Sequence, residues 1–141
     1  MNSNTYVIGS GLLLIMFVMS GINKMLTFDK TVRNVSSKLN VNETISKIGV
    51  YLVILIEILA PLIIMYYISM NKYKDNYKMN EMYETSKTYA LYSVFTLIIF
   101  TIIVTVIYHP PKINYYESIA FWANISLLGG LLLLKTKVDE V

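Results

Sequence analysis

The sequence contains no cysteine, a single histidine and few charged residues, and each shortage excludes a kind of chemistry. Without cysteine the chain can form no disulfide bond, no thiol redox centre and no cysteine-ligated metal site. One histidine does not supply the usual cluster of histidine and carboxylate ligands, so we expect no metal. Charged residues make up only 15% of the 141 positions, and the net charge is +3. No basic stripe is interleaved with aromatics, so we expect no nucleic-acid partner.

Hydrophobic residues, by contrast, account for 55% of the chain and gather into four long runs. About 20 apolar residues at 1.5 Å each are enough to cross a hydrocarbon core of ~30 Å. The runs predict spans near residues 5–26, 48–70, 89–108 and 117–135. The predicted fold class is therefore all-α: one domain, residues 1–141, forming an antiparallel four-helix bundle in a lipid bilayer. Which membrane holds it does not follow from these runs.

The charged residues beside the spans do not determine how the protein is oriented in the membrane. No basic residue precedes the first apolar run, which argues against a signal peptide. Lysine and arginine residues are equally numerous on the two predicted sides, so the positive-inside rule does not decide the orientation. Lys135 and Lys137 in the tail favour cytosolic termini, and we adopt that orientation as the prediction.

A short amphipathic helix is expected between the first two spans. Phe28, Val32, Val35 and Leu39 recur on one helical face with polar residues opposite. Such a segment lies on a membrane surface or caps a bundle. The segment Asn42-Glu43-Thr44 predicts a turn before the second span, and residues 71–88 predict a polar, tyrosine-rich connection without chemistry.

Several small residues favour close approach of neighbouring helices. On the first span these are Gly9, Gly11, Ser20 and Gly21, and on the fourth span they are the pair at 129–130. His109 is followed by Pro110 and Pro111, which end the third span because prolines cannot continue a helix.

Glu57 lies at the midpoint of the second span, Ile48 to Ile68, and is the one carboxylate in that run. A charge at the bilayer centre costs about 2.5–3.5 kcal/mol on insertion scales. Glu57 must therefore be neutral, paired, or directed into a polar cavity. Four residues later Pro61 lacks an N–H group, which leaves the carbonyl of Glu57 without its usual helical donor.

Three other polar residues complete a candidate intramembrane polar site around Glu57, to which we assign no catalytic residue. Asn124 in the fourth span is either a hydrogen-bonding link between helices or part of a binding site. Lys24 extends either to the lipid headgroups or inward toward Glu57. His109 is either an interfacial residue or a functional imidazole.

Depth along the membrane normal sets the expected pairing inside this site. Glu57 and Asn124 each lie near the middle of their spans, so we expect them to face each other and to share a hydrogen bond. Lys24 is expected on the same face as Phe17 and Ser20. We do not expect a direct Lys24–Glu57 ion pair, because the two α-carbons should differ in depth by several ångströms. The hydroxyls of Thr101 and Thr105 are expected to bond to their own helix.

Taken together, the chain resembles the DoxX family of small four-helix membrane proteins over nearly its whole length. The resemblance is carried by Gly21-Ile-Asn-Lys24, Glu57, His109 and the segment Phe121-Trp-Ala-Asn124-Ile-Ser-Leu-Leu-Gly-Gly-Leu-Leu-Leu-Leu134. It implies a membrane protein, sometimes associated with redox complexes such as thiosulfate–quinone oxidoreductase. A quinone is a possible ligand by this resemblance alone, and we expect no other cofactor.

Two functions are compatible with these features. The preferred interpretation is a non-catalytic subunit or scaffold, partnered by another membrane protein or by a second copy of the chain. The alternative is a small transporter or a binding site, built around Glu57, for a quinone-like or other lipophilic molecule or for protons. An enzyme activity of the isolated chain is not predicted.

Overall fold

A computed structural model describes residues 3–70, 80–111 and 118–140, which form five helices and no strand. The helices are α1 (Ser3–Leu26), α2 (Phe28–Leu39), α3 (Glu43–Met70), α4 (Asn80–Tyr108) and α5 (Ile119–Glu140). In the described part of the chain, α1, α3, α4 and α5 are long and apolar enough to cross a membrane. The predicted all-α fold, with a short helix between the first two long ones, is confirmed.

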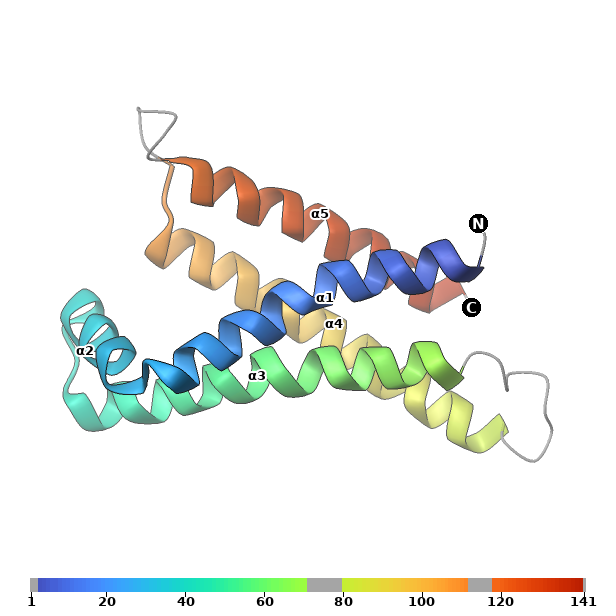
Figure 1. The fold of residues 1–141 in the computed structure, drawn as a ribbon, viewed down its shortest axis with the longest axis horizontal. Helices are drawn as coiled ribbons and strands as arrows, with labels where there is room; N and C mark the ends of the chain where they lie inside the picture. Colours follow the sequence, from blue (N-terminus) through green and yellow to red (C-terminus); the bar gives the residue numbers. More distant parts are fainter. Residues whose placement is uncertain (1–2, 71–79, 112–117, 141) are drawn as a thin grey trace.

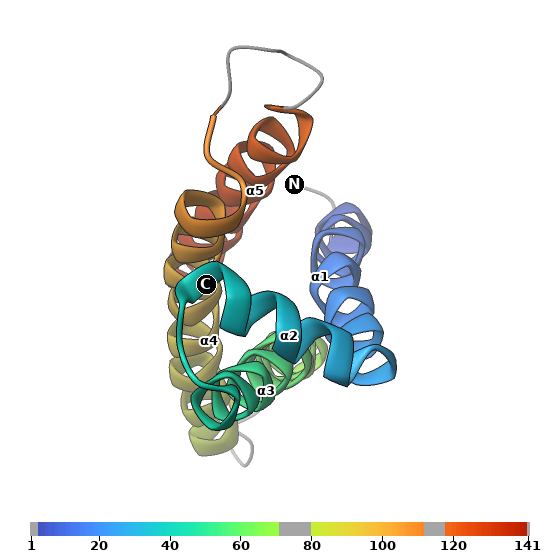
Figure 2. The ribbon, with the colours of Figure 1, turned by 90° about the vertical axis from the view of Figure 1, so that its left-hand side faces the viewer.

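The four long helices lie roughly along one axis, and α2 crosses one end of the molecule (Figure 1). α3 packs against α1, α2 and α4, and α5 packs mainly against α4. The start of α1 and the end of α5 lie together at the end opposite α2 (Figure 1). From that end toward α2, α4 and α5 diverge from α1 and α3, and the view along the axis shows the separation between α1 and α5 (Figure 2).

Local sequence explains why α2 is a separate helix. At Thr27, between α1 and α2, the backbone leaves helical geometry, with φ −115° and ψ 33°. α2 ends at Asn40, whose left-handed φ of 53° suits a helix C-terminus. Two residues later the Oδ1 of Asn42 accepts a 2.8 Å hydrogen bond from the N–H of Ile45, which caps the start of α3.

The predicted amphipathic stripe of α2 is confirmed by its packing at Phe28, Val32 and Val35, whereas Leu39 is 43% exposed. Val32 is 1% exposed and lies in a cluster with Val50 and Ile54 of α3. Phe28 and Val35 pack against the same cluster. α2 therefore packs its apolar face on α3.

The main core occupies the half of the molecule away from α2. It joins side chains of all four long helices, among them Leu14, Ile64, Val94 and Leu131, each 0–1% exposed. The outer faces of the same helices remain apolar and exposed, as at Leu133, which is 75% exposed. Apolar surface of this extent suits contact with lipid chains rather than water.

Three helices extend beyond the predicted spans, whose bounds in a membrane stay a prediction. α3 begins at Glu43 rather than residue 48, α4 begins at Asn80 rather than residue 89, and α5 continues to Glu140 rather than residue 135. The apolar runs mark only the segment that suits hydrocarbon, whereas polar turns beyond them stay helical. The Glu43–Lys47 ion pair of 2.8 Å, one turn apart on α3, stabilises such a turn.

Two predicted connections change with these boundaries. Of the turn expected at 42–44, Asn42 is the helix cap and the other two residues belong to α3. Residues 80–88 of the second connection are helical. Residues 71–79, and positions 112–117 of the third connection, lie outside the described residues.

Candidate functional site

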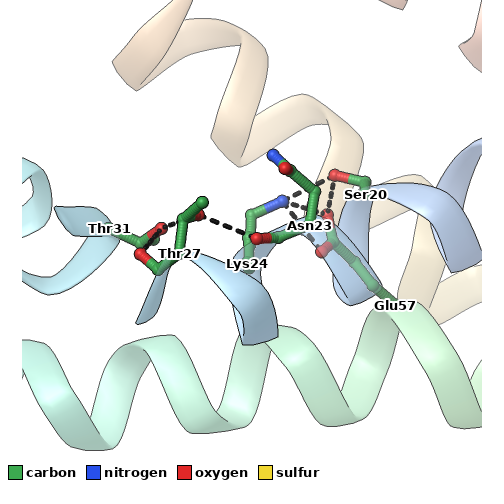
Figure 3. Close-up of polar contacts among 6 residues, drawn as sticks. All are labelled: Ser20, Asn23, Lys24, Thr27, Thr31 and Glu57. Atoms are coloured by element: carbon green, nitrogen blue, oxygen red, sulfur yellow. Dashed lines mark hydrogen bonds and ion pairs between the residues drawn. The ribbon is translucent and has the colours of Figure 1, made fainter. Parts of the chain in front are cut away.

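Glu57 is held by an ion pair with Lys24. The Nζ of Lys24 lies 2.8 Å from both Oε1 and Oε2 of the carboxylate (Figure 3). The Glu57 side chain is 4% exposed and the Lys24 side chain is 26% exposed. The expectation that no direct ion pair forms is therefore wrong.

The direction of the side chains explains this correction. A Cα–Cβ bond in a helix tilts toward the helix N-terminus. Because α1 and α3 run in opposite directions (Figure 1), Lys24 tilts toward the middle of the molecule and Glu57 tilts toward the α2 end. The two side chains thus converge, and a difference in α-carbon depth does not keep their charged groups apart.

Ser20 completes the contact between the two helices. Its hydroxyl donates to Oε1 of Glu57 over 3.0 Å and accepts a 2.6 Å hydrogen bond from Lys24. Ser20 and Lys24 lie one turn apart on α1, so one face of that helix binds the carboxylate at two levels (Figure 3). Ser20 was expected on this face, but only as a small residue for helix packing. Its spacing of four residues from Lys24 was the available signal.

Gly21 allows this approach of α1 to α3. A Cβ at Gly21 would lie 2.9 Å from Cγ1 of Ile58 and 3.2 Å from Cβ of Glu57. Any side chain there would therefore push the helices apart. Among the other predicted small residues, a Cβ at Gly130 would lie 2.8 Å from Cδ1 of Leu13 on α1, while a Cβ at Gly9 or Gly129 would meet nothing within 4 Å.

The ion pair faces a cavity of about 620 Å³ between the diverging helices. All five helices contribute to its wall, and the residues lining it include the four predicted site residues Lys24, Glu57, His109 and Asn124. Most of the remaining wall is apolar, as at Phe17, Val53 and Leu127. The volume lies within the range of roughly 300–1,000 Å³ typical of small-molecule sites.

Asn124 and Glu57 share this cavity without the hydrogen bond that we expected between them. Within the described residues the carboxylate of Glu57 contacts Lys24 and Ser20, and the Asn124 amide makes no hydrogen bond. The carboxylate is bound by Lys24 instead, and Asn124 lines the cavity without contacting that group. Equal depth of the two residues in a membrane stays a prediction.

The part of the cavity wall formed by α4 and His109 carries both polar side chains that are hydrogen-bonded within the described chain and polar side chains that are not. The hydroxyls of Thr101 and Thr105 donate to the carbonyls of Leu97 and Thr101 at 2.7 and 2.6 Å, as predicted. His109 follows the end of α4, where its backbone N–H donates to Thr105. Its half-buried ring lines the cavity and has no hydrogen-bond partner among the residues that the structure describes.

Two further features lie at the opposite end of the molecule. The hydroxyls of Tyr67 and Tyr83 are 3.2 Å apart within the core, a contact that sequence reasoning missed because Tyr83 lay in a predicted connection.

A hollow of about 740 Å³ lies between α3 and α4 near Tyr66, Glu81 and Tyr89. It is larger than the cavity around Glu57, but it is mostly lined by exposed residues and holds no ion pair within the described chain. We therefore place the candidate site at the smaller cavity.

Metal binding has no structural support in the described ranges, where no three histidine or carboxylate side chains lie close enough to hold an ion.

Comparison with known proteins adds no identification. No family model matches the sequence, and searches of curated proteins and of solved structures found no match.

Proposed function

We propose that this chain is a multi-pass membrane protein of DoxX-like architecture, with four antiparallel spans, that binds a small lipophilic molecule in the cavity beside Glu57. The observation that carries the proposal is the cavity itself: a mostly apolar space of about 620 Å³ with an ion pair, an amide and an imidazole on its wall. Apolar pockets with a few convergent polar groups are the usual form of small-molecule sites.

Membrane insertion is supported by the four long apolar helices, and the antiparallel order by their alternating directions in Figure 1. The DoxX-like assignment is supported by the sequence features of Lys24, Glu57, His109 and Asn124. The structure brings these four residues to one cavity.

Retention of a bound molecule tests this proposal. Val53 lines the cavity from α3, whereas the neighbouring Leu52 is 55% exposed on the outer face. We expect protein purified from native membrane in mild detergent to carry a lipophilic molecule, detected by native mass spectrometry. Val53→Trp should lose it, and the matched Leu52→Trp should keep it. An empty wild-type protein, or equal retention by both variants, would contradict the proposal.

A second candidate function is that of a non-catalytic scaffold subunit. It is favoured by the complete pairing of Glu57 within the chain, which joins α1 to α3 without any ligand. Glu57→Gln keeps the shape and most hydrogen bonds of the side chain but removes its charge. A scaffold with this substitution should still co-purify with the same membrane partner or second copy. A binding site that uses the charge of Glu57 should instead lose its bound molecule.

A further inference from the structure

The charges that line the cavity cancel each other. Lys24 and Glu57 are the two residues of charged type among its described lining residues, and the ammonium group contacts both carboxylate oxygens. Lys24 also donates to Ser20, so its donors are directed at acceptors of the chain. An ionic ligand would find no free counter-charge there and would have to compete with this pair. An uncharged ligand leaves the pair intact.

Several polar side chains that line the cavity remain available. The amides of Asn23 and Asn34 are exposed, and the hydroxyl of Tyr108 is half-buried. The other two belong to Asn124 and His109. Both side chains are half-buried, both line the cavity, and neither makes a hydrogen bond within the described residues. An asparagine amide both donates and accepts, and a neutral imidazole does the same. An unpaired amide is costly away from water. A hydroxyl or carbonyl group in the cavity would satisfy these side chains.

An apolar chain attached to such a head has a route to lipid between α1 and α5. The contact of Leu13 with Gly130 joins these helices on the side away from α2. Toward α2 the helices separate (Figure 2), and Met16 and Leu127 line the cavity one turn beyond that contact. Met16 is 63% exposed, so the cavity wall continues onto the outer apolar surface at this point.

We infer that the cavity takes an uncharged amphipathic molecule, whose hydroxyl or carbonyl head bonds to Asn124 and His109. Its apolar chain passes between α1 and α5 into the surrounding lipid. This inference rests on the proposed binding function and specifies the chemical class and the orientation of the ligand.

Photolabelling in lipid nanodiscs tests the head and the chain together. The probe is hexadecanol carrying a diazirine in mid-chain. Competitors of equal chain length are hexadecanol, hexadecyl sulfonate and hexadecyltrimethylammonium. We expect saturable labels on α1 and α5 around Met16 and Leu127. Hexadecanol should compete about tenfold better than either ion, because an ion has to disrupt the Lys24–Glu57 pair.

A matched pair of α5 variants tests the role of Asn124. Asn124→Ala should lower labelling about five- to tenfold, the effect of one lost hydrogen bond. Ser126→Ala, on the same helix with its hydroxyl bonded to the carbonyl of Trp122, should label as wild type. Equal melting temperatures of the two variants would exclude a loss of folding as the cause.

The outcomes separate this inference from the proposed function. Equal or better competition by either ion, an unaffected Asn124→Ala variant, or labels away from α1 and α5 would overturn the inference. In another outcome, the wild-type protein carries a native molecule that Val53→Trp loses, yet shows no saturable labelling by the probe. That result would also overturn the inference but leave the binding function standing. If the wild-type protein carries no native molecule either, both fail.

Discussion

The two ends of this molecule are formed by the same long helices, but the helices pack tightly at one end and diverge at the other. Away from α2, the helices enclose a core in which Ile64, Ala90, Leu97 and Val138 are 0% exposed. Toward α2, the same helices diverge around a cavity of about 620 Å³ that exposes an ion pair, an amide and an imidazole. Close packing contributes stability, and unfilled space with polar groups contributes a place to bind. We therefore expect changes at the core end to affect stability alone, and changes at the cavity end to affect binding as well.

The ion pair should give the largest effect on stability at the cavity end. Lys24→Met leaves the carboxylate of Glu57, whose side chain is 4% exposed, without its cation, and should destabilise the protein by about 3 kcal/mol. Glu57→Leu should cost less, because Lys24 near the end of α1 can extend to the headgroups. The double variant should recover most of the loss. Unfolding free energies in detergent micelles provide the measurement, and additive losses in the double variant would argue against a coupled pair.

Close approach of α1 and α3 gives the next largest effect. Gly21→Val places atoms where a Cβ already comes within 2.9 Å of Ile58, and should cost about 1–3 kcal/mol. It should also weaken the Lys24–Glu57 contact and reduce ligand retention. Gly9→Val is the matched control on the same helix, because nothing lies within 4 Å of a Cβ there. Equal melting temperatures for the two variants would show that the α1–α3 approach is not limiting.

The predictable and unpredictable parts of this structure differ in their physical cause. Apolar runs and the stripe of Val32 and its neighbours predicted the helices, because hydrophobic periodicity is a property of the local chain. The full length of α3 did not follow from its apolar run, because capping by Asn42 and the ion pair of Glu43 extend the helix beyond that run. The orientation in a membrane stays a prediction.

Within the candidate site, the identity of the residues was predictable but their pairing was not. Charged or amide groups in apolar runs are conspicuous, and all four predicted residues line one cavity. Whether Glu57 contacts Lys24 or Asn124 depends on side-chain tilt and on the approach allowed at Gly21. These are tertiary properties that spacing along the chain does not determine. The cavity itself depends on the divergence of α4 and α5 from α1 and α3, which has no sequence signature.

A smaller effect is expected from the tyrosine pair at the core end. Tyr67→Phe removes the 3.2 Å contact with the hydroxyl of Tyr83 and should lower the unfolding free energy by about 1 kcal/mol. Tyr66→Phe, at the neighbouring position and 49% exposed, should change it by less than about 0.5 kcal/mol. Neither variant should alter ligand retention. Loss of the bound molecule in Tyr67→Phe would break the division of the molecule into a packing end and a binding end.

The smallest effect on stability, and the sharpest test of that division, is expected from Asn124→Leu. Because the amide makes no hydrogen bond within the described residues, its removal should lower the unfolding free energy by less than about 0.5 kcal/mol. The same variant should lose the bound molecule, since leucine offers the cavity neither a donor nor an acceptor. Thermal unfolding in detergent and native mass spectrometry on one preparation provide both values. A loss of stability above about 1 kcal/mol, with the molecule retained, would mean that Asn124 links helices rather than binds a ligand.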